Sequence, residues 1–100
     1  MTLYYEGNMI ITFACADTEK LFNSYSVRRF KNIEQVCRRK LLMVHAATKI
    51  ESLKVPPGNR LEVLHGDRKG QHSIRINDQW RVCFRWAKDG VYEVEIVDYH

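Results

Sequence analysis

Apolar and polar side chains alternate with a period of two in the C-terminal part of this 100-residue chain. Apolar residues at even-numbered positions form three groups: Ile74 and Ile76; Trp80, Val82, Phe84 and Trp86; and Tyr92, Val94 and Ile96. Because successive side chains of a β-strand point to opposite faces, each group marks one face of a strand. The alternation predicts three consecutive antiparallel strands. It also sets their register, because a slip of one residue would turn a strand inside out.

Two short polar segments separate the predicted strands. Asn77-Asp78-Gln79 is expected to form the first turn. Lys88-Asp89-Gly90 is expected to form a three-residue hairpin loop, with Gly90 in the left-handed conformation that such loops need.

The other face of the predicted sheet carries charged residues. The register sets Arg85 opposite Glu93, which predicts a structural ion pair. It also sets Arg75 directly opposite Arg81, with Tyr99 diagonal to Arg81. Two opposed arginines destabilise a sheet unless an anion lies between them or their side chains extend into water. The arginine pair therefore predicts either a phosphate site or two solvated side chains.

Helical periodicity replaces this alternation further upstream. A stripe of residues at helical spacing predicts an amphipathic helix of about four turns from Phe30. The stripe consists of Ile33, Cys37, Leu41, Val44 and Thr48. A shorter helix is expected to begin at Ala16-Asp17-Thr18-Glu19.

Shorter elements complete the N-terminal half. Ile10, Ile11 and Phe13 suggest a short strand, and Ile50 to Lys54 suggest a last turn, which Pro56-Pro57-Gly58 stops. The predicted fold class is α+β: a short N-terminal strand and two helices packed on a C-terminal antiparallel β-sheet. A chain of this length has room for one domain.

Composition and residue spacing exclude several classes of protein. Cys15, Cys37 and Cys83 are odd in number and lie in apolar runs, which is typical of reduced thiols in a cytosolic protein. The four histidines lack the short spacings of a metal site, so no metal or other cofactor is expected. The apolar stretch from Met9 to Ala16 is too short to span a membrane and follows an acidic segment, so we expect a cytoplasmic protein without a signal peptide.

Two polar segments are candidates for contact with a polyanion, which the net charge of +4 also favours. The loop from His65 to Gly70 combines two glycines with Arg68 and Lys69, and suits close approach to a phosphate backbone. Asp98-Tyr99-His100 brings three titratable groups to the end of a strand that shares its sheet with the arginine pair. A frayed, solvated tail is the plainer interpretation of the second segment.

Together these segments resemble the HigB-type toxins of the RelE/ParE superfamily. The resemblance is carried by Gly66-Asp67-Arg68-Lys69-Gly70, by residues 73–84 (SIRINDQWRVCF) and by residues 94–100 (VEIVDYH), with Cys15-Ala16-Asp17-Thr18-Glu19 and residues 56–61 (PPGNRL) upstream. It runs from about Met9 to His100, so residues 9–100 are expected to form one RelE-like toxin domain and residues 1–8 an N-terminal extension.

The resemblance implies a toxin of a type II toxin-antitoxin system that cleaves translated mRNA on the ribosome, without a metal or cofactor. By position, His100 is implied as general acid or base, Asp98 as its electrostatic partner, Tyr99 as a stacking or proton-relaying group, and Arg81 as charge stabiliser. The implied RNA-binding residues are Arg60, His65, Arg68, Lys69 and Arg75.

The same resemblance implies the partners of the protein. They are the ribosome, mRNA and a HigA-type antitoxin with a helix-turn-helix domain, and operator DNA would be bound only through the antitoxin complex. The chain departs from the family pattern at Glu62, where some relatives have histidine, and at His65, where lysine is frequent. These departures leave the proton-transfer partner open, and a histidine in place of the lysine at position 65 predicts a slower or more pH-sensitive enzyme.

Two other functions remain open at this stage. One is a ParE-like protein that poisons DNA gyrase and cuts nothing. The other is a basic RNA-binding module that inhibits translation by occupying the ribosome. A shared fold does not separate these functions, but the Asp98-Tyr99-His100 ending favours the nuclease.

Overall fold

The computed structural model describes residues 7–99, so most of the predicted N-terminal extension and His100 lie outside the described residues. The chain forms α1 (Ala16–Phe22), α2 (Glu34–Ala46) and four strands: β1 (Glu62–Val63), β2 (His72–Arg75), β3 (Trp80–Ala87) and β4 (Gly90–Asp98). Four 3₁₀ helices connect them: η1 (Arg28–Ile33), η2 (Ile50–Lys54), η3 (Pro57–Asn59) and η4 (Gly66–Arg68).

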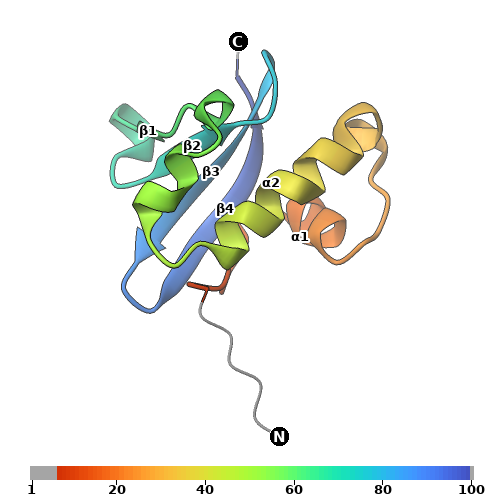
Figure 1. Cartoon of the computed structure of the whole chain (residues 1–100). Helices are drawn as coiled ribbons and strands as arrows, with labels where there is room; N and C mark the ends of the chain where they lie inside the picture. Colours follow the sequence, from red (N-terminus) through yellow and green to blue (C-terminus); the bar gives the residue numbers. More distant parts are fainter. Residues whose placement is uncertain (1–6, 100) are drawn as a thin grey trace, which may run out of the picture.

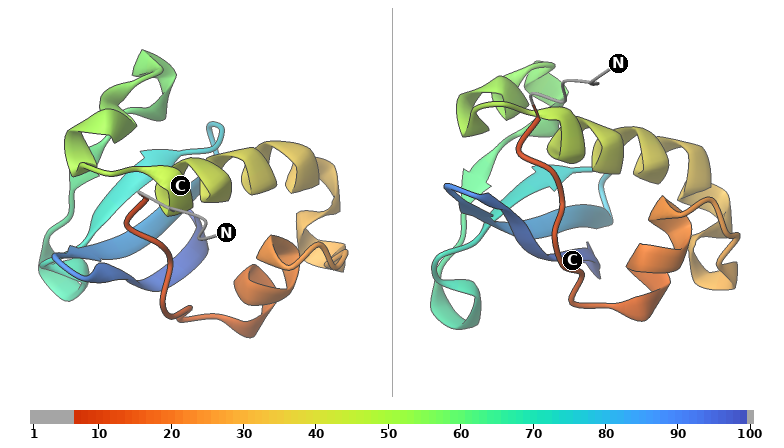
Figure 2. Two further views of the ribbon diagram at one scale, coloured as in Figure 1. Left: turned by 60° about the horizontal axis from the view of Figure 1, so that its bottom comes forward. Right: turned by 90° about the horizontal axis from the view of Figure 1, so that it is seen from below.

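The strands form one antiparallel sheet in the order β1-β2-β3-β4. Helix α2 lies across one face of this sheet, and α1 stands beside β4 (Figure 1). Figure 2 shows the same two layers from below. The predicted α+β class with two helices on an antiparallel sheet is confirmed. Strand β1 was not predicted, because its two residues are too few to show alternation.

The core lies between α2 and the sheet, and most of the even-numbered strand residues predicted to be buried form its sheet side. Ile74, Val82, Phe84, Val94 and Ile96 are buried. In the predicted register, Ile74 pairs with Val82 and Val82 with Ile96, which confirms the one-sided pattern over most of the sheet.

A β-bulge in β4 changes the register near the hairpin. Cys83 pairs with Glu95, but Arg85 pairs with Tyr92, so β4 has one extra residue at Glu93, whose φ is 56°. The bulge turns Val91 into the core and Tyr92 to the other face, so the predicted burial of Tyr92 is wrong. The predicted pairing of Arg85 with Glu93 is also wrong, although their side chains form an ion pair at 2.6 Å.

The hairpin loop is one residue shorter than predicted. Ala87 pairs with Gly90, which leaves only Lys88 and Asp89 in the loop. Gly90 has a positive φ of 158°, a backbone conformation that favours glycine. A Cβ atom at Gly90 would also lie 2.4 Å from Cγ1 of Ile11, so close approach of the N-terminal segment is a second reason for glycine here.

The N-terminal segment runs parallel to β4 but pairs with it only through two isolated bridges, Ile10 to Val91 and Phe13 to Val94. Between these bridges the bulge points the N–H of Glu93 to Oγ1 of Thr12, at 2.8 Å. The bulge thus interrupts the ladder, and the bridges take the place of the short strand that was predicted.

The amphipathic helix is shorter than predicted at both ends. Residues from Phe30 to Ile33 belong to η1, and α2 ends at Ala46. Ile33, Cys37, Leu41 and Val44 are buried as expected. Thr48 is exposed, because the backbone becomes extended at Ala47 and ends the helical stripe there.

The cysteines are all free thiols. Cys37 and Cys83 are buried, whereas Cys15 is half-buried. Burial raises the pKa of the Cys37 thiol to about 12 and also raises the pKa of Cys83. Among residues 7–99, no helix has the length and apolar content needed to cross a membrane.

Candidate functional site

The sheet face opposite α2 carries a set of ion pairs in place of a second apolar layer. Odd-numbered residues of β2 and β3 point to this face, as the alternation requires. Three arginines on or beside it each have a carboxylate partner: Arg68 with Glu95 at 3.2 Å, Arg81 with Glu62 at 3.8 Å, and Arg85 with Glu93 at 2.6 Å.

Arg81 lies on this face near the start of β3, and its side chain is only 9% exposed. Its Nε donates to Oγ of Ser73 at 2.7 Å, and its Nη2 donates to the carbonyl oxygen of Arg60 at 2.7 Å. The Tyr99 ring lies over the guanidinium, with 5.9 Å between Arg81 Cζ and the ring centre. Arg81 is therefore a fixed, partly covered positive charge.

Arg75 stands directly opposite Arg81, as predicted. Its guanidinium forms an ion pair with Asp78, three residues along the chain. Each arginine thus has acceptors within the protein, and the ion pair of Arg75 lies at the surface, because the Asp78 side chain is fully exposed.

In the loop from His65 to Gly70, one cation is held by contacts within the protein and another is exposed. Arg68 donates to Gln71 Oε1 at 3.1 Å and to Glu95 Oε1 at 3.2 Å, so it fastens η4 to the sheet. His65 and Lys69 are exposed. Gly70 has a φ of 92°, and its carbonyl oxygen accepts a hydrogen bond from Arg85 Nη1 at 3.4 Å.

The C-terminal residues pack against the turn that precedes β3. Asp98 accepts a hydrogen bond from Gln79 Nε2 at 3.0 Å, and the Tyr99 N–H donates to the Gln79 carbonyl oxygen at 2.5 Å. Tyr99 thus lies beside Arg81, whereas Asp98 pairs with Trp80 and its side chain is on the other face of the sheet. Both residues follow a defined path rather than a frayed tail. His100 follows them outside the described residues.

Two residues that the sequence interpretation did not single out as site residues hold this arrangement together. Ser73 positions Arg81, and Gln79 positions Asp98 and Tyr99. Ser73 was accessible to the register argument, because it pairs with Cys83 and is therefore a diagonal neighbour of Arg81. The role of Gln79 has no periodic signal, since turn residues do not alternate.

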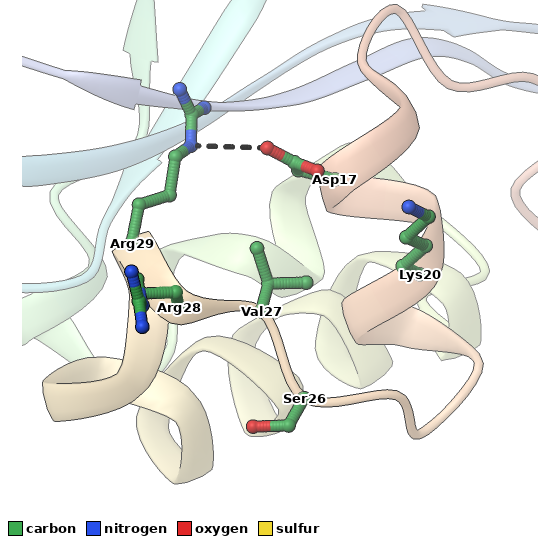
Figure 3. Close-up of a pocket in the computed structure, with 6 residues that line it drawn as sticks. All are labelled: Asp17, Lys20, Ser26, Val27, Arg28 and Arg29. Atoms are coloured by element: carbon green, nitrogen blue, oxygen red, sulfur yellow. Dashed lines mark ion pairs between the residues drawn. The ribbon is translucent and has the colours of Figure 1, made fainter.

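A pocket of about 410 Å³ lies between α1 and η1 (Figure 3). It is lined by Asp17, Lys20, Ser26, Val27, Arg28 and Arg29. A second hollow of about 390 Å³ shares Arg29 with it and reaches Gln79 and Trp80 at the start of β3. None of these residues was among the predicted site residues.

Within residues 7–99, no group of three or more His, Cys, Asp or Glu side chains is arranged to hold a metal ion. The polar groups of the face instead satisfy one another, through the ion pairs of Arg68, Arg81 and Arg85. As an arrangement of charges, the site offers a fixed guanidinium with an aromatic ring beside it and the Glu62 carboxylate 3.8 Å away.

Two comparisons with known proteins point to one family. A family model described as "RelE-like toxin of type II toxin-antitoxin system HigB" matches residues 13–100. The chain is 45% identical over 69 residues to a protein of Vibrio cholerae called Toxin HigB-1, covering 69% of this chain and 72% of that protein. It is 37% identical over 60 residues to an uncharacterized protein of Haemophilus influenzae, covering 60% of this chain and 59% of that protein.

A solved structure of the YoeB-YefM complex from Staphylococcus aureus contains a similar chain. The TM-score is 0.54 at 18% sequence identity, and the alignment covers 91% of this chain and 94% of the other. This likeness concerns the fold alone.

Proposed function

The chain belongs to the HigB-like family of RelE-like toxins of type II toxin-antitoxin systems, and on this basis we propose that it is a ribosome-dependent endoribonuclease that cleaves translated mRNA. The observation that carries the proposal is the placement of Tyr99 beside Arg81, with 5.9 Å between Arg81 Cζ and the centre of the Tyr99 ring. This arrangement joins a titratable C-terminus to a fixed positive charge.

The proposed reaction is attack of a ribose 2′-hydroxyl on the adjacent phosphorus. The new O–P bond replaces the bond to the 5′-oxygen, leaving a cyclic phosphate and a 5′-hydroxyl. A base must remove the 2′ proton, an acid must protonate the leaving oxygen, and a cation must stabilise the phosphorane. The chain's own residues offer these groups without a cofactor.

The roles follow from the family and from the geometry of the face. We assign His100 as the general acid or base, Asp98 as its electrostatic partner, and Tyr99 as a base-stacking or proton-relaying group. Arg81 stabilises the developing charge. Its hydrogen bonds to Ser73 and Arg60 orient the guanidinium in advance, which is the requirement for electrostatic catalysis.

The proposed RNA contacts divide into two kinds. Arg60, His65 and Lys69 are exposed and are available for phosphate contacts. Arg68 and Arg75 already hold carboxylates, so an RNA phosphate must compete with Glu95 and Asp78 for them. We expect the exposed set to contribute more to RNA affinity.

The proposed partners are those of a toxin that acts on the ribosome in the cytoplasm. A HigA-type antitoxin with a helix-turn-helix domain would neutralise it, and operator DNA would be bound only through that antitoxin. The toxin-antitoxin class rests on the family match.

The test is to map mRNA 5′ ends after brief induction of the wild-type protein and of His100→Ala, with protein levels matched. We expect new cleavage sites within translated codons for the wild type and a loss of about 10²- to 10⁴-fold for the variant. Intact messages with blocked translation would indicate a non-catalytic ribosome binder. Intact messages with DNA damage signalling would indicate a gyrase poison, and either result overturns the proposal.

A further inference from the structure

The pocket between α1 and η1, called here the α1–η1 pocket, carries more positive than negative charge. Lys20, Arg28 and Arg29 supply three cations, whereas Asp17 is the only carboxylate among its six lining residues. Figure 3 shows Lys20 on the α1 side, Arg28 and Arg29 on the η1 side, and Val27 between them. Cations from α1 and from η1 thus line one opening.

The one ion pair in the pocket leaves most of this charge available. Arg29 Nε lies 3.6 Å from Asp17 Oδ2, and these side chains are 51% and 39% exposed, so the pair is weak and screened. The Arg29 guanidinium also stacks 4.6 Å from the centre of the Phe30 ring, which limits its motion. Lys20 and Arg28 form no ion pair within residues 7–99.

The α1–η1 pocket is connected to the C-terminal residues. Arg29 also lines the second hollow, together with Asn77, Gln79 and Trp80. The side chain of Gln79 donates to Asp98, and its carbonyl oxygen accepts the N–H of Tyr99. Arg29 and Gln79 therefore link the α1–η1 pocket to the C-terminal residues by way of the second hollow.

We propose that the α1–η1 pocket binds a phosphate of the RNA strand beyond the nucleotides held at the C-terminal residues. This inference rests on the proposed function, because it takes the strand's position from Asp98 and Tyr99. A phosphate suits the pocket because the surplus cations are exposed and unneutralised. The amide side chains of Asn77 and Gln79 in the second hollow suit sugar and base edges.

The experiment measures binding without cleavage. The full chain carrying His100→Ala is titrated into a fluorescently labelled single-stranded RNA oligonucleotide, and anisotropy gives the affinity at several salt concentrations. The test variant adds Lys20→Ala and Arg28→Ala. The control variant adds Lys54→Ala and Lys88→Ala, which remove the same charge from exposed positions on η2 and the β3–β4 loop. Thermal unfolding verifies that all variants are folded.

The expected result is a specific change in salt dependence. Loss of one phosphate contact lowers the slope of log K against log salt by about 0.7 for a single strand. We expect this decrease, together with weaker binding, for the Lys20/Arg28 variant and not for the Lys54/Lys88 variant. Asp17→Asn removes the only lining carboxylate and is expected to tighten binding, an effect that a merely structural role would not produce.

Three outcomes overturn the inference. In the first, the test and control variants bind RNA equally. In the second, the His100→Ala protein shows no measurable RNA binding. In the third, the Lys20/Arg28 variant binds RNA as before but no longer captures the antitoxin. The last result would assign the pocket to a protein partner. Each outcome is separate from the proposed nuclease activity, which the mapping of mRNA 5′ ends decides.

Discussion

At the scale of single residues, Arg81 shows how the fold keeps a charge in place beneath the candidate site. Burying a guanidinium is costly unless its donors are paired. Ser73 and the Arg60 carbonyl accept its hydrogen bonds, and Glu62 supplies a negative charge at 3.8 Å. The position of the Arg81 guanidinium therefore depends on Ser73, Arg60 and Glu62 together.

Two histidines make stability dependent on pH. Burial lowers the pKa of both His45 and His72. His45 Nδ1 accepts the N–H of Ile10 at 3.0 Å, and Nδ1 of His72 is buried without a hydrogen-bond partner among residues 7–99. The folded protein therefore holds both imidazoles in the neutral form.

We expect the free energy of unfolding to fall as the pH is lowered below about 6.5, the ordinary histidine pKa, because the unfolded chain then binds more protons than the folded chain. The free energy of unfolding stops falling from this cause once the pH is below the lowered pKa values that His45 and His72 have in the folded protein. Urea titrations between pH 7.5 and 5 measure it. The double variant His45→Gln with His72→Gln should show a shallower pH dependence, and an unchanged one would contradict the assignment.

At the scale of elements, α2 is fastened to the segment that follows it by a buried polar contact. Lys40 Nζ donates to Asn59 Oδ1 at 2.5 Å, and the Asn59 amide donates to the carbonyl oxygen of Leu53 at 3.1 Å. Burial, and then the charges of Arg39 and Arg75, lower the pKa of Lys40. Asn59 thus links α2, η2 and η3.

Asn59→Ala is expected to lower the free energy of unfolding by about 2–3 kcal/mol, because it leaves a buried ammonium and a buried carbonyl without partners. Denaturant unfolding measures the loss. Adding Lys40→Met should recover part of it, because removal of both partners avoids an unpaired buried charge. If the two changes were simply additive, the contact would not have the proposed role. Ser52→Ala, at an exposed position, is the control.

At the scale of the whole molecule, the N-terminal segment joins parts of the chain that are distant in sequence. Asn8 donates through its backbone N–H to the Ala47 carbonyl oxygen at 2.9 Å and through Nδ2 to the Ala87 carbonyl oxygen at 2.8 Å. Ile10 and Phe13 then bridge to β4. This segment holds the end of α2 and the β3–β4 hairpin together, and so supports the sheet on which the site lies.

Gly90→Ala tests this closure, because the new Cβ would lie 2.4 Å from Ile11 Cγ1. We expect a loss of about 1–3 kcal/mol from overpacking. In the double variant with Ile11→Ala, the additional loss caused by Gly90→Ala should be smaller. Thermal unfolding of the four proteins in this cycle gives the coupling, and a coupling of zero would show that the segment does not pack against the hairpin in solution.

The sequence by itself determined the α+β class, the direction of the core-facing side chains in most of the sheet, and the buried stripe of α2. These features follow from periods of two and of about 3.6 residues, which are local properties of the backbone. The sequence also predicted that Arg81 and Tyr99 are neighbours, because the strand register places them diagonally on adjacent strands. Only the tertiary structure decided the bulge at Glu93, the short strand β1, the burial of Arg81 and the α1–η1 pocket. These features depend on contacts between segments far apart in the chain, and such contacts leave no periodic trace in the sequence.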